Sequence, residues 1–217
     1  MSLRQTHEEI ARRAGAILSP ELRAALDEML QLLANSGMVA ASLKPGDRIP
    51  DFELPNVEGE LISSADLLAR GPLVLSFFRG DWCPYCNAEL QALQEALPEI
   101  ESCNATLVAV TPDTREAALS PKRRHQLTYQ VLSDVDNGLG LLFGVIFRMP
   151  QALREQYLKL GIDLGARHGN DAWFLPIPAT YVIDRRGVVR HAELNTDFRR
   201  RMEPAEIVRR LKEIGPE

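Results

Sequence analysis

The feature that most constrains the fold is a pair of cysteines placed between a buried strand and a helix. Residues 73–78, Leu-Val-Leu-Ser-Phe-Phe, form a nearly continuous apolar run, which is typical of a strand buried on both faces. Five positions further on, residues 83–86 read Cys-Pro-Tyr-Cys, and a proline at a first helical position predicts a helix over 84–102. A strand that delivers a C-x-x-C to the start of a helix is a specific context for thiol redox chemistry.

The two thiols of this pair are expected to differ in depth and in reactivity. Cys83 lies at the exposed end of the predicted helix, where unpaired N–H groups and the helix dipole stabilise a thiolate and lower its pKa. Cys86 lies one turn further in and is more shielded. The spacing brings the two sulfurs close enough for a disulfide, so we predict that Cys83 attacks and Cys86 resolves. Trp82, Pro84 and Tyr85 are predicted to support the site.

Two other interpretations of the cysteine pair are a half zinc site and a pair of inert buried thiols. A zinc site needs two more ligands, and the chain offers only Cys103 and four histidines, with no second C-x-x-C and no H-x₃₋₅-H. We therefore predict no metal. No G-x-G-x-x-G or G-x-x-x-x-G-K-[ST] occurs, so we predict no nucleotide or flavin cofactor either. Cys103, at the end of the predicted helix, is interpreted as a spare thiol.

Composition narrows the class of protein and the compartment. The chain has 217 residues, three cysteines and a formal net charge of −5. An odd count of three cannot form a disulfide framework, and a reducing cytoplasm is the expected location. The acidic balance argues against a nucleic-acid partner. The longest apolar run, 139–147, is far shorter than the ~20 residues of a membrane span, and the first residues lack the apolar core of a signal peptide. No membrane partner is expected.

The first 42 residues are predicted to form a helical extension, followed by one redox domain over 43–217. Thr6 and Glu9 have the spacing of a capping box, and Ser19-Pro20 has the pattern of a second helix start. The apolar positions that follow repeat with helical spacing and form one face: Leu22, Leu26, Met29, Leu30 and Leu33. This face must be covered either by the chain's own domain or by a second copy in a homodimer.

After residue 50 the chain alternates between strand and helix patterns. A hairpin is predicted around 52–54 and 61–62, and a second one, with the turn 184–187, over 180–183 and 188–194. Further elements are predicted at 63–69, 106–110, 113–126, 130–132, 151–160 and 204–214. The segment 161–176, which carries His168, is interpreted as an insertion with ordinary loop packing; the alternatives are a substrate wall or an oligomer contact. The basic run Arg199-Arg-Arg201 is interpreted as a solvated helix end. Together the elements indicate an α/β fold with a mixed sheet flanked by helices.

The late segment Ile177-Pro178-Ala179-Thr180, just before a predicted strand, resembles the corresponding part of thioredoxin-fold proteins. That resemblance implies a cis Ile177–Pro178 bond packed against the cysteine pair. It also implies that the Ile177 backbone is available to pair with an extended substrate, so both residues are predicted to bind substrate.

A wider resemblance covers residues 43–211. Residues 45–55, 77–86, 131–134 and 178–184 are similar to motifs of the AhpC/TSA group (alkyl hydroperoxide reductase / thiol-specific antioxidant), the peroxiredoxin-like branch of the thioredoxin superfamily. The resemblance implies a thioredoxin-like fold with a β-hairpin addition and an antioxidant or thiol-redox role. It implies a thioredoxin- or glutathione-type reductant as the electron donor, with no bound cofactor.

The chain also departs from the peroxiredoxin pattern. When P-x-x-x-T-x-x-C is laid on the sequence, its cysteine falls on Cys86, its threonine on Cys83 and its proline on Arg79. The arginine that peroxiredoxins carry before the late strand is replaced by Pro178. Arg79 and Arg148 are the two candidates to supply a guanidinium in its place.

These observations lead to a main functional prediction and two alternatives. The main prediction is a thiol–disulfide and antioxidant oxidoreductase in which Cys83 and Cys86 cycle between dithiol and disulfide. The first alternative is a thiol-dependent peroxidase in which Cys86 attacks the peroxide and Cys83 closes the disulfide. The second is a redox-sensing module without turnover. The substrate is therefore predicted to be a peroxide or a disulfide.

Overall fold

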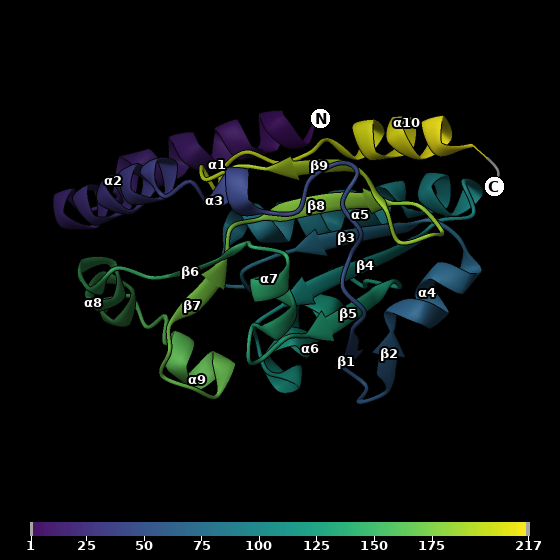
Figure 1. Ribbon diagram of the computed structural model, residues 1–217. Helices are drawn as coiled ribbons and strands as arrows, with labels where there is room; N and C mark the ends of the chain where they lie inside the picture. The colour runs from purple at the N-terminus through teal and green to yellow at the C-terminus, as the bar shows by residue number, and fades with distance from the viewer. Residues whose placement is uncertain (1, 216–217) are drawn as a thin grey trace.

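Five strands form the central mixed sheet of the computed structural model, which describes residues 2–215 (Figure 1). Their order across the sheet is β5-β4-β3-β8-β9. The parallel half holds β3 (Leu73–Phe77), β4 (Thr106–Thr111) and β5 (Gln130–Ser133). The other half is antiparallel and holds β8 (Ala179–Ile183) and β9 (Val189–Leu194), which form the predicted hairpin.

Alternate residues of the central strand face two separate cores, because successive side chains of a strand point to opposite faces. Leu75 and Phe77 face the core that includes residues of α2 (Pro20–Asn35), α7 (Gly138–Leu142) and α8 (Gln151–Lys159). Val74 faces the second core, with residues of α5 (Pro84–Ser102), α6 (Arg115–Arg124) and α10 (Pro204–Ile214). All five residues of β3 are buried, as the apolar run predicts.

The N-terminal segment forms α1 (Leu3–Ile17), α2 (Pro20–Asn35) and the short α3 (Met38–Ala41). Ser19 caps α2 as predicted, accepting a hydrogen bond from the Leu22 N–H. The capping box predicted at Thr6 is wrong: α1 begins earlier, and Ser2 and Gln5 form the reciprocal pair. Thr6 lies inside the first turns, where its hydroxyl donates to the Ser2 carbonyl.

The apolar stripe of α2 packs against the protein's own core. Leu22, Met29 and Leu33 are buried in the same cluster as the sheet, while Leu26 and Leu30 are only half-buried at its margin. The α2 helix contacts α8, and α1 contacts α5. In Figure 1 α1 begins beside α10 and runs along the top of the molecule, and α2 lies at the end nearest α8. The division of the chain at residues 42 and 43 stays a prediction.

The predicted hairpin addition is present as β1 (Glu53–Pro55) and β2 (Leu61–Ser63), followed by α4 (Ser64–Arg70) with Ser63 as its cap. Four short elements have no counterpart in the predictions. The run 139–147, interpreted only as core, contains α7 and β6 (Ile146–Arg148). The insertion contains α9 (Leu164–His168) and β7 (Phe174–Pro176), which pairs with β6. Three- to five-residue elements are too short to produce a readable period.

No helix within residues 2–215 combines the length and the apolar character that crossing a membrane requires.

Candidate active site

The cysteine pair lies at the carboxyl end of β3, where the chain turns into α5. The strand ends at Phe77, and Cys83 is the N-cap residue of the helix, with Pro84 in its first turn. Both cysteines are free thiols, and their exposed fractions are 1% for Cys83 and 0% for Cys86. The predicted strand–C-x-x-C–helix arrangement is therefore present, but Cys83 is far more buried than its place at the helix start suggested.

A buried arginine is the direct partner of Cys83. The Arg79 Nη2 atom donates to the Cys83 Sγ atom at 3.1 Å, and the Arg79 side chain is almost fully buried. Its guanidinium lies over the rings of Phe198 and Trp82, at 4.2 and 5.1 Å from their centroids. Within residues 2–215 no carboxylate pairs with Arg79, and its Nε has no hydrogen-bond partner. Since a buried charge needs a compensating one, the Cys83 thiolate is the counter-charge of Arg79.

The surroundings favour the thiolate form of Cys83 and the thiol form of Cys86. Burial raises the pKa of Cys83, but hydrogen bonding to the Cys86 thiol and the charges of Arg79 and Arg201 outweigh it and hold the pKa well below the ordinary value. Burial and the neighbouring Cys83 sulfur raise the pKa of Cys86 well above the ordinary value. These opposite shifts favour a thiolate at Cys83 beside a protonated thiol at Cys86.

Cys86 has its own buried charged neighbours, Arg201 and Glu89. The Arg201 Nε atom lies 2.7 Å from Glu89 Oε2, and the exposed fractions of the two side chains are 2% and 3%. Arg201 Nη2 lies 3.6 Å from Cys86 Sγ. Burial raises the pKa of Glu89, against the charge and hydrogen bond of Arg201. The prediction that residues 199–201 form a solvated helix end is wrong for Arg201, because its guanidinium is buried against Glu89 of α5 and also donates to the Phe198 and Arg200 carbonyl oxygens.

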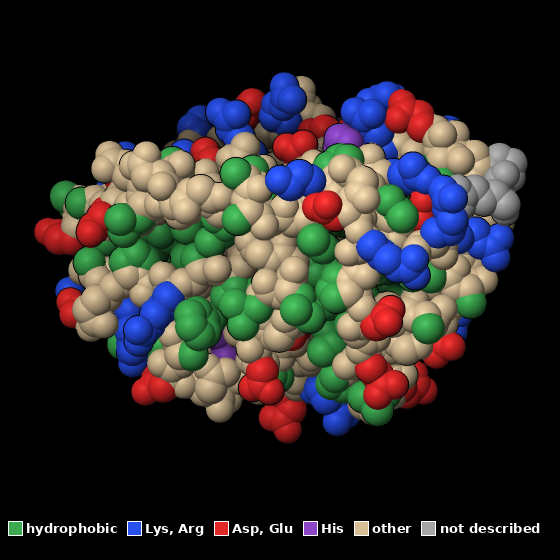
Figure 2. Space-filling view, in the orientation of Figure 1, with side chains coloured by type: hydrophobic (Ala, Val, Ile, Leu, Met, Phe, Trp, Pro, Cys, Tyr) green, Lys and Arg blue, Asp and Glu red, His purple; other side chains and the backbone are tan. Residues whose placement is uncertain are grey.

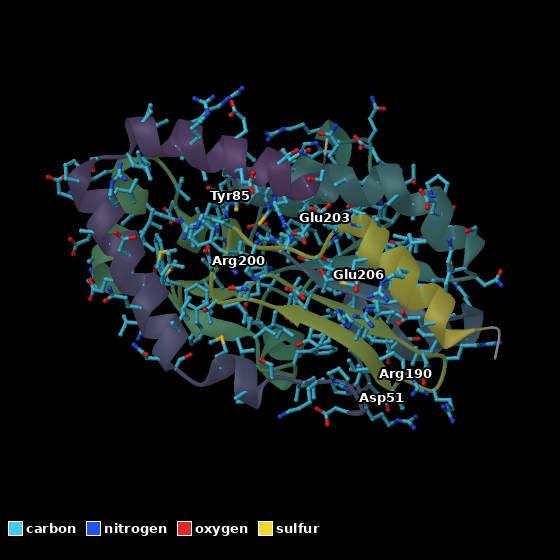
Figure 3. The ribbon with its side chains drawn as sticks, turned by 90° about the horizontal axis from the view of Figure 1, so that it is seen from above. Asp51, Tyr85, Arg190, Arg200, Glu203 and Glu206 are labelled. Atoms are coloured by element: carbon cyan, nitrogen blue, oxygen red, sulfur yellow. The ribbon has the colours of Figure 1, made fainter. Side chains whose placement is uncertain are left out.

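The N-terminal helix also reaches the cysteine pair. The ring nitrogens of buried His7 lie 3.0 Å from the Arg199 carbonyl oxygen and 3.1 Å from that of Tyr85. The Tyr85 ring packs edge-on against the rings of His7 and Phe198. Figure 3 shows Tyr85 beneath α1, with Glu203 beside the beginning of that helix. His7 of the N-terminal extension thus contacts the backbone of the C-P-Y-C segment. Local sequence patterns do not predict this contact, because the two residues are far apart in the sequence.

The insertion is tied to the loop before the cysteines. Arg167 of α9 forms ion pairs with Asp81 and with buried Asp113, the latter at 2.8 Å. Burial raises the pKa of Asp113 to about 6, despite Arg167. The His168 Nε2 atom lies 3.7 Å from Asp113 Oδ1, and burial lowers the pKa of His168 to about 4. Through Arg167, the insertion therefore holds the loop that contains Asp81 and precedes Cys83.

Two expectations about Ile177 need correction, whereas substrate binding by Ile177 and Pro178 stays a prediction. No peptide bond among the described residues is cis, so the expected cis Ile177–Pro178 bond is wrong. The Ile177 N–H donates to the Val145 carbonyl at 2.8 Å, continuing the β6–β7 pairing of the insertion. That N–H is therefore not free to pair with an extended substrate. Pro178 is buried at the start of β8, at the same edge of the sheet as the end of β3.

The remaining predicted residues differ in their burial and in their distance from the cysteine pair. Trp82 is half-buried and packs on the Tyr157 ring at 5.3 Å, whereas Pro84 is exposed. Arg148 is exposed on β6, so of the two arginine candidates Arg79 is the one that contacts the Cys83 sulfur.

Cys103 is the C-cap residue of the 19-residue helix α5, so ~28 Å of helix separates it from the cysteine pair. No group of three or more candidate ligands for a metal ion occurs within residues 2–215.

The opposite pKa shifts of the two cysteines predict selective alkylation. A thiolate is the reactive form, so the reaction of Cys83 with iodoacetamide is expected to persist at pH 7 and to fade only as pH falls through its lowered pKa. Cys86 is expected to stay unmodified over the same range. Mass spectrometry of samples quenched between pH 5 and 9 measures both profiles. A Cys83 midpoint at or above the ~8.5 of a free thiol would contradict the assignment.

Comparisons with known proteins agree with this geometry. A model of the AhpC/TSA family matches residues 45–192. A putative peroxiredoxin of Coxiella burnetii is 29% identical over 105 residues, which are 48% of this chain and 69% of that protein. The chloroplastic peroxiredoxin Q of Suaeda salsa is 26% identical over 152 residues, which are 70% of this chain and 60% of that protein.

Solved structures are similar over most of the chain. The crystal structure of peroxidoxin BcpB from Mycobacterium tuberculosis gives a TM-score of 0.63 at 22% identity, covering 80% of this chain and 99% of that one. The reduced 2-Cys peroxiredoxin of Plasmodium vivax gives 0.61 at 19% identity, covering 79% and 96%. The predicted thioredoxin-like α/β fold is thereby confirmed.

The comparisons also decide between the functional predictions at the level of class. The relatives are peroxiredoxins, which confirms a thiol-dependent, peroxiredoxin-like enzyme and favours the peroxidase alternative over disulfide exchange, our main prediction. Such a family implies a peroxide substrate and a thiol reductant. Because the family model covers well over half of the sequence, this chain belongs to the AhpC/TSA family.

Proposed function

We propose that this protein reduces hydroperoxides, with Cys83 as the attacking thiolate and Cys86 as the resolving thiol. The observation that carries the proposal is the hydrogen bond from Arg79 to the Cys83 sulfur, in a site where Cys83 but not Cys86 lines a cavity. The nucleophile is thus the sulfur that is both negatively charged and reachable by a small molecule.

The proposed reaction has two steps on the protein. The Cys83 thiolate attacks one peroxide oxygen, so an S–O bond forms, the O–O bond breaks, and the leaving oxygen takes a proton from water to become an alcohol. The Cys86 thiol then attacks the Cys83 sulfenic acid, forming the disulfide and releasing water. The two electrons that reduce the peroxide come from the two sulfurs. An external thiol reductant restores them and is itself oxidised to a disulfide.

The charges around the two sulfurs support these roles for Cys83 and Cys86. Arg79 stabilises the thiolate before attack and lies where an oxygen bound to Cys83 gains negative charge. Cys86 stays protonated beside it, so it does not compete for the peroxide, and it is next to the sulfur that it must resolve. The alignment of the peroxiredoxin motif instead assigns attack to Cys86, which is fully buried and carries a raised pKa.

Access supports a peroxide rather than a protein disulfide as the oxidising substrate. Cys83 is 1% exposed, and it opens onto a cavity walled in part by α1 and α2. The Ile177 N–H, which an extended peptide would need, is already bonded to Val145. A small hydroperoxide meets neither obstacle.

Trapping the first oxidised sulfur tests the proposal. In a Cys103→Ser background, the Cys86→Ser and Cys83→Ser proteins are each mixed with one equivalent of hydrogen peroxide and dimedone, then mapped by mass spectrometry. Rapid dimedone labelling of Cys83 in Cys86→Ser, with only slow labelling of Cys86 in Cys83→Ser, is expected. Rapid labelling of Cys86 in Cys83→Ser would support the motif-based assignment. Slow labelling of both, with insulin reduction that requires Cys83, would reject the peroxidase.

A further inference from the structure

The cavity at Cys83 is built largely by helices that the family match does not cover. It has a volume of about 330 Å³, within the range of small-molecule sites. Its floor holds Cys83, Arg79 and Trp82, from the matched region. One wall is formed by α1 and α2, which lie in residues 3–35 and therefore outside the match to residues 45–192.

The wall formed by α1 is held in place at its start and in its second turn. The Glu203 carboxylate accepts hydrogen bonds from the N–H groups of Leu3 and Arg4, at 3.2 and 2.7 Å, where the helix dipole favours a negative charge. His7 then contacts the Tyr85 and Arg199 carbonyl oxygens. Figure 3 shows Glu203 at the start of α10, beside the first turn of α1. These contacts hold the first two turns of α1 against Tyr85 and the start of α10.

The lining of the cavity is apolar above a polar, reactive floor. On α1 the lining residues are small: Ala11, Ala14 and Gly15. A Cβ atom added at Gly15 would meet nothing within 4 Å, so space remains on this side. On α2 the lining residues are leucines one turn apart: Leu22, Leu26 and Leu30. The half-buried part of the apolar stripe, Leu26 and Leu30, thus lines the cavity.

Charged lining residues lie near solvent and leave the interior apolar. Arg23, Asp27 and Arg199 line the cavity and are exposed residues. Further lining residues, Leu160 and Ile162, follow α8, and Figure 2 shows apolar side chains gathered at the end of the molecule where α2 and α8 lie. A ligand that fits has one polar, reducible end at Cys83 and Arg79 and a hydrocarbon body between the two helices.

From this arrangement we propose that α1 and α2 form a binding site for the hydrocarbon body of a bulky organic hydroperoxide and present its O–O bond to Cys83. The inference rests on the proposed function and adds the residues, outside the family match, that select among its hydroperoxide substrates. The reaction is unchanged: the hydroperoxide becomes the corresponding alcohol as Cys83 becomes a sulfenic acid. Hydrogen peroxide, which has no hydrocarbon body, gains nothing from the two helices.

Filling the cavity tests the proposal, with cumene hydroperoxide and hydrogen peroxide as probes. The Ala14→Phe substitution places a ring in the cavity, and Ala16→Phe is the matched control because Ala16 is exposed on the same helix. We expect Ala14→Phe to lower kcat/KM for cumene hydroperoxide by at least about tenfold and that for hydrogen peroxide by less than about twofold. Ala16→Phe is expected to change neither. Equal losses with both peroxides, or no loss, would overturn the site.

A second measurement does not depend on turnover or on the variant's folding. Octan-1-ol, an unreactive analogue of the hydrocarbon body, is expected to slow alkylation of Cys83 by iodoacetamide in the unmodified protein. Absence of this protection at saturating octanol would overturn the site even if peroxidase activity is present. Failure of the proposed function has a different signature, since the unmodified protein would then reduce neither peroxide.

Discussion

Replacing Arg79 with methionine is expected to lower kcat/KM for hydroperoxides by about 10²–10³-fold at pH 7, the usual cost of removing one preorganised charge-stabilising donor. Methionine keeps much of the length and apolar contact of the side chain, so the change isolates the guanidinium. Two effects combine. The pKa of Cys83 rises because its charged partner is gone, and the donor beside the reacting sulfur is lost.

The pH dependence separates these two effects. A raised pKa reduces the thiolate fraction at pH 7, and alkaline solution restores it, so part of the loss is expected to be recovered as pH rises towards 9. The part that persists reports the lost donor. Stopped-flow measurement of the peroxide reaction between pH 6 and 9 gives both. Arg148→Met is the matched control because Arg148 is exposed on β6. Equal rates in Arg79→Met and the unmodified protein would contradict the assigned role.

Replacing Glu89 with leucine is expected to destabilise the fold by about 3–5 kcal/mol, the usual result of removing one partner of a buried ion pair. The cost arises because Arg201 stays buried and charged with its carboxylate removed. Urea unfolding followed by circular dichroism measures the free energy of unfolding of the reduced protein.

A double variant provides the control for this prediction. In Glu89→Leu/Arg201→Met both charges are replaced by apolar groups, and most of the stability is expected to return, since apolar replacements of buried pairs are often neutral. A loss below about 1 kcal/mol in the single variant would show that Arg201 finds another partner or reaches solvent. A double variant as unstable as the single one would instead identify a packing defect.

Much of the fold was predictable because its signals are local. Ser19 and Ser63 cap the helices that follow them, and the prolines at 84 and 204 mark helix starts, as their fixed backbone geometry favours. Local signals were ambiguous where two neighbouring segments had the same pattern. Ser2-x-x-Gln5 and Thr6-x-x-Glu9 both have the capping-box spacing, and only the full helix shows which one is used.

The two sulfurs and Arg79 of the candidate site were predictable from the sequence, whereas the Glu89–Arg201 ion pair was not. Cys83, Cys86 and Arg79 lie within one local segment, whereas Glu89 and Arg201 are 112 residues apart in sequence. No spacing rule relates residues on separate elements. The cis Ile177–Pro178 bond came from a resemblance alone, and this chain's own insertion bonds the Ile177 N–H to Val145 at that position.

The burial of Arg79 has a consequence for the redox potential of the cysteine pair. In the dithiol state the Cys83 thiolate neutralises a guanidinium that no carboxylate within residues 2–215 accompanies. Formation of the disulfide removes this negative charge and leaves Arg79 positive in the same apolar surroundings. The fold therefore stabilises the dithiol relative to the disulfide, which raises the reduction potential and makes the disulfide a stronger oxidant. In the proposed reaction, the residue that stabilises the Cys83 thiolate before attack therefore also favours the return of electrons from the external thiol.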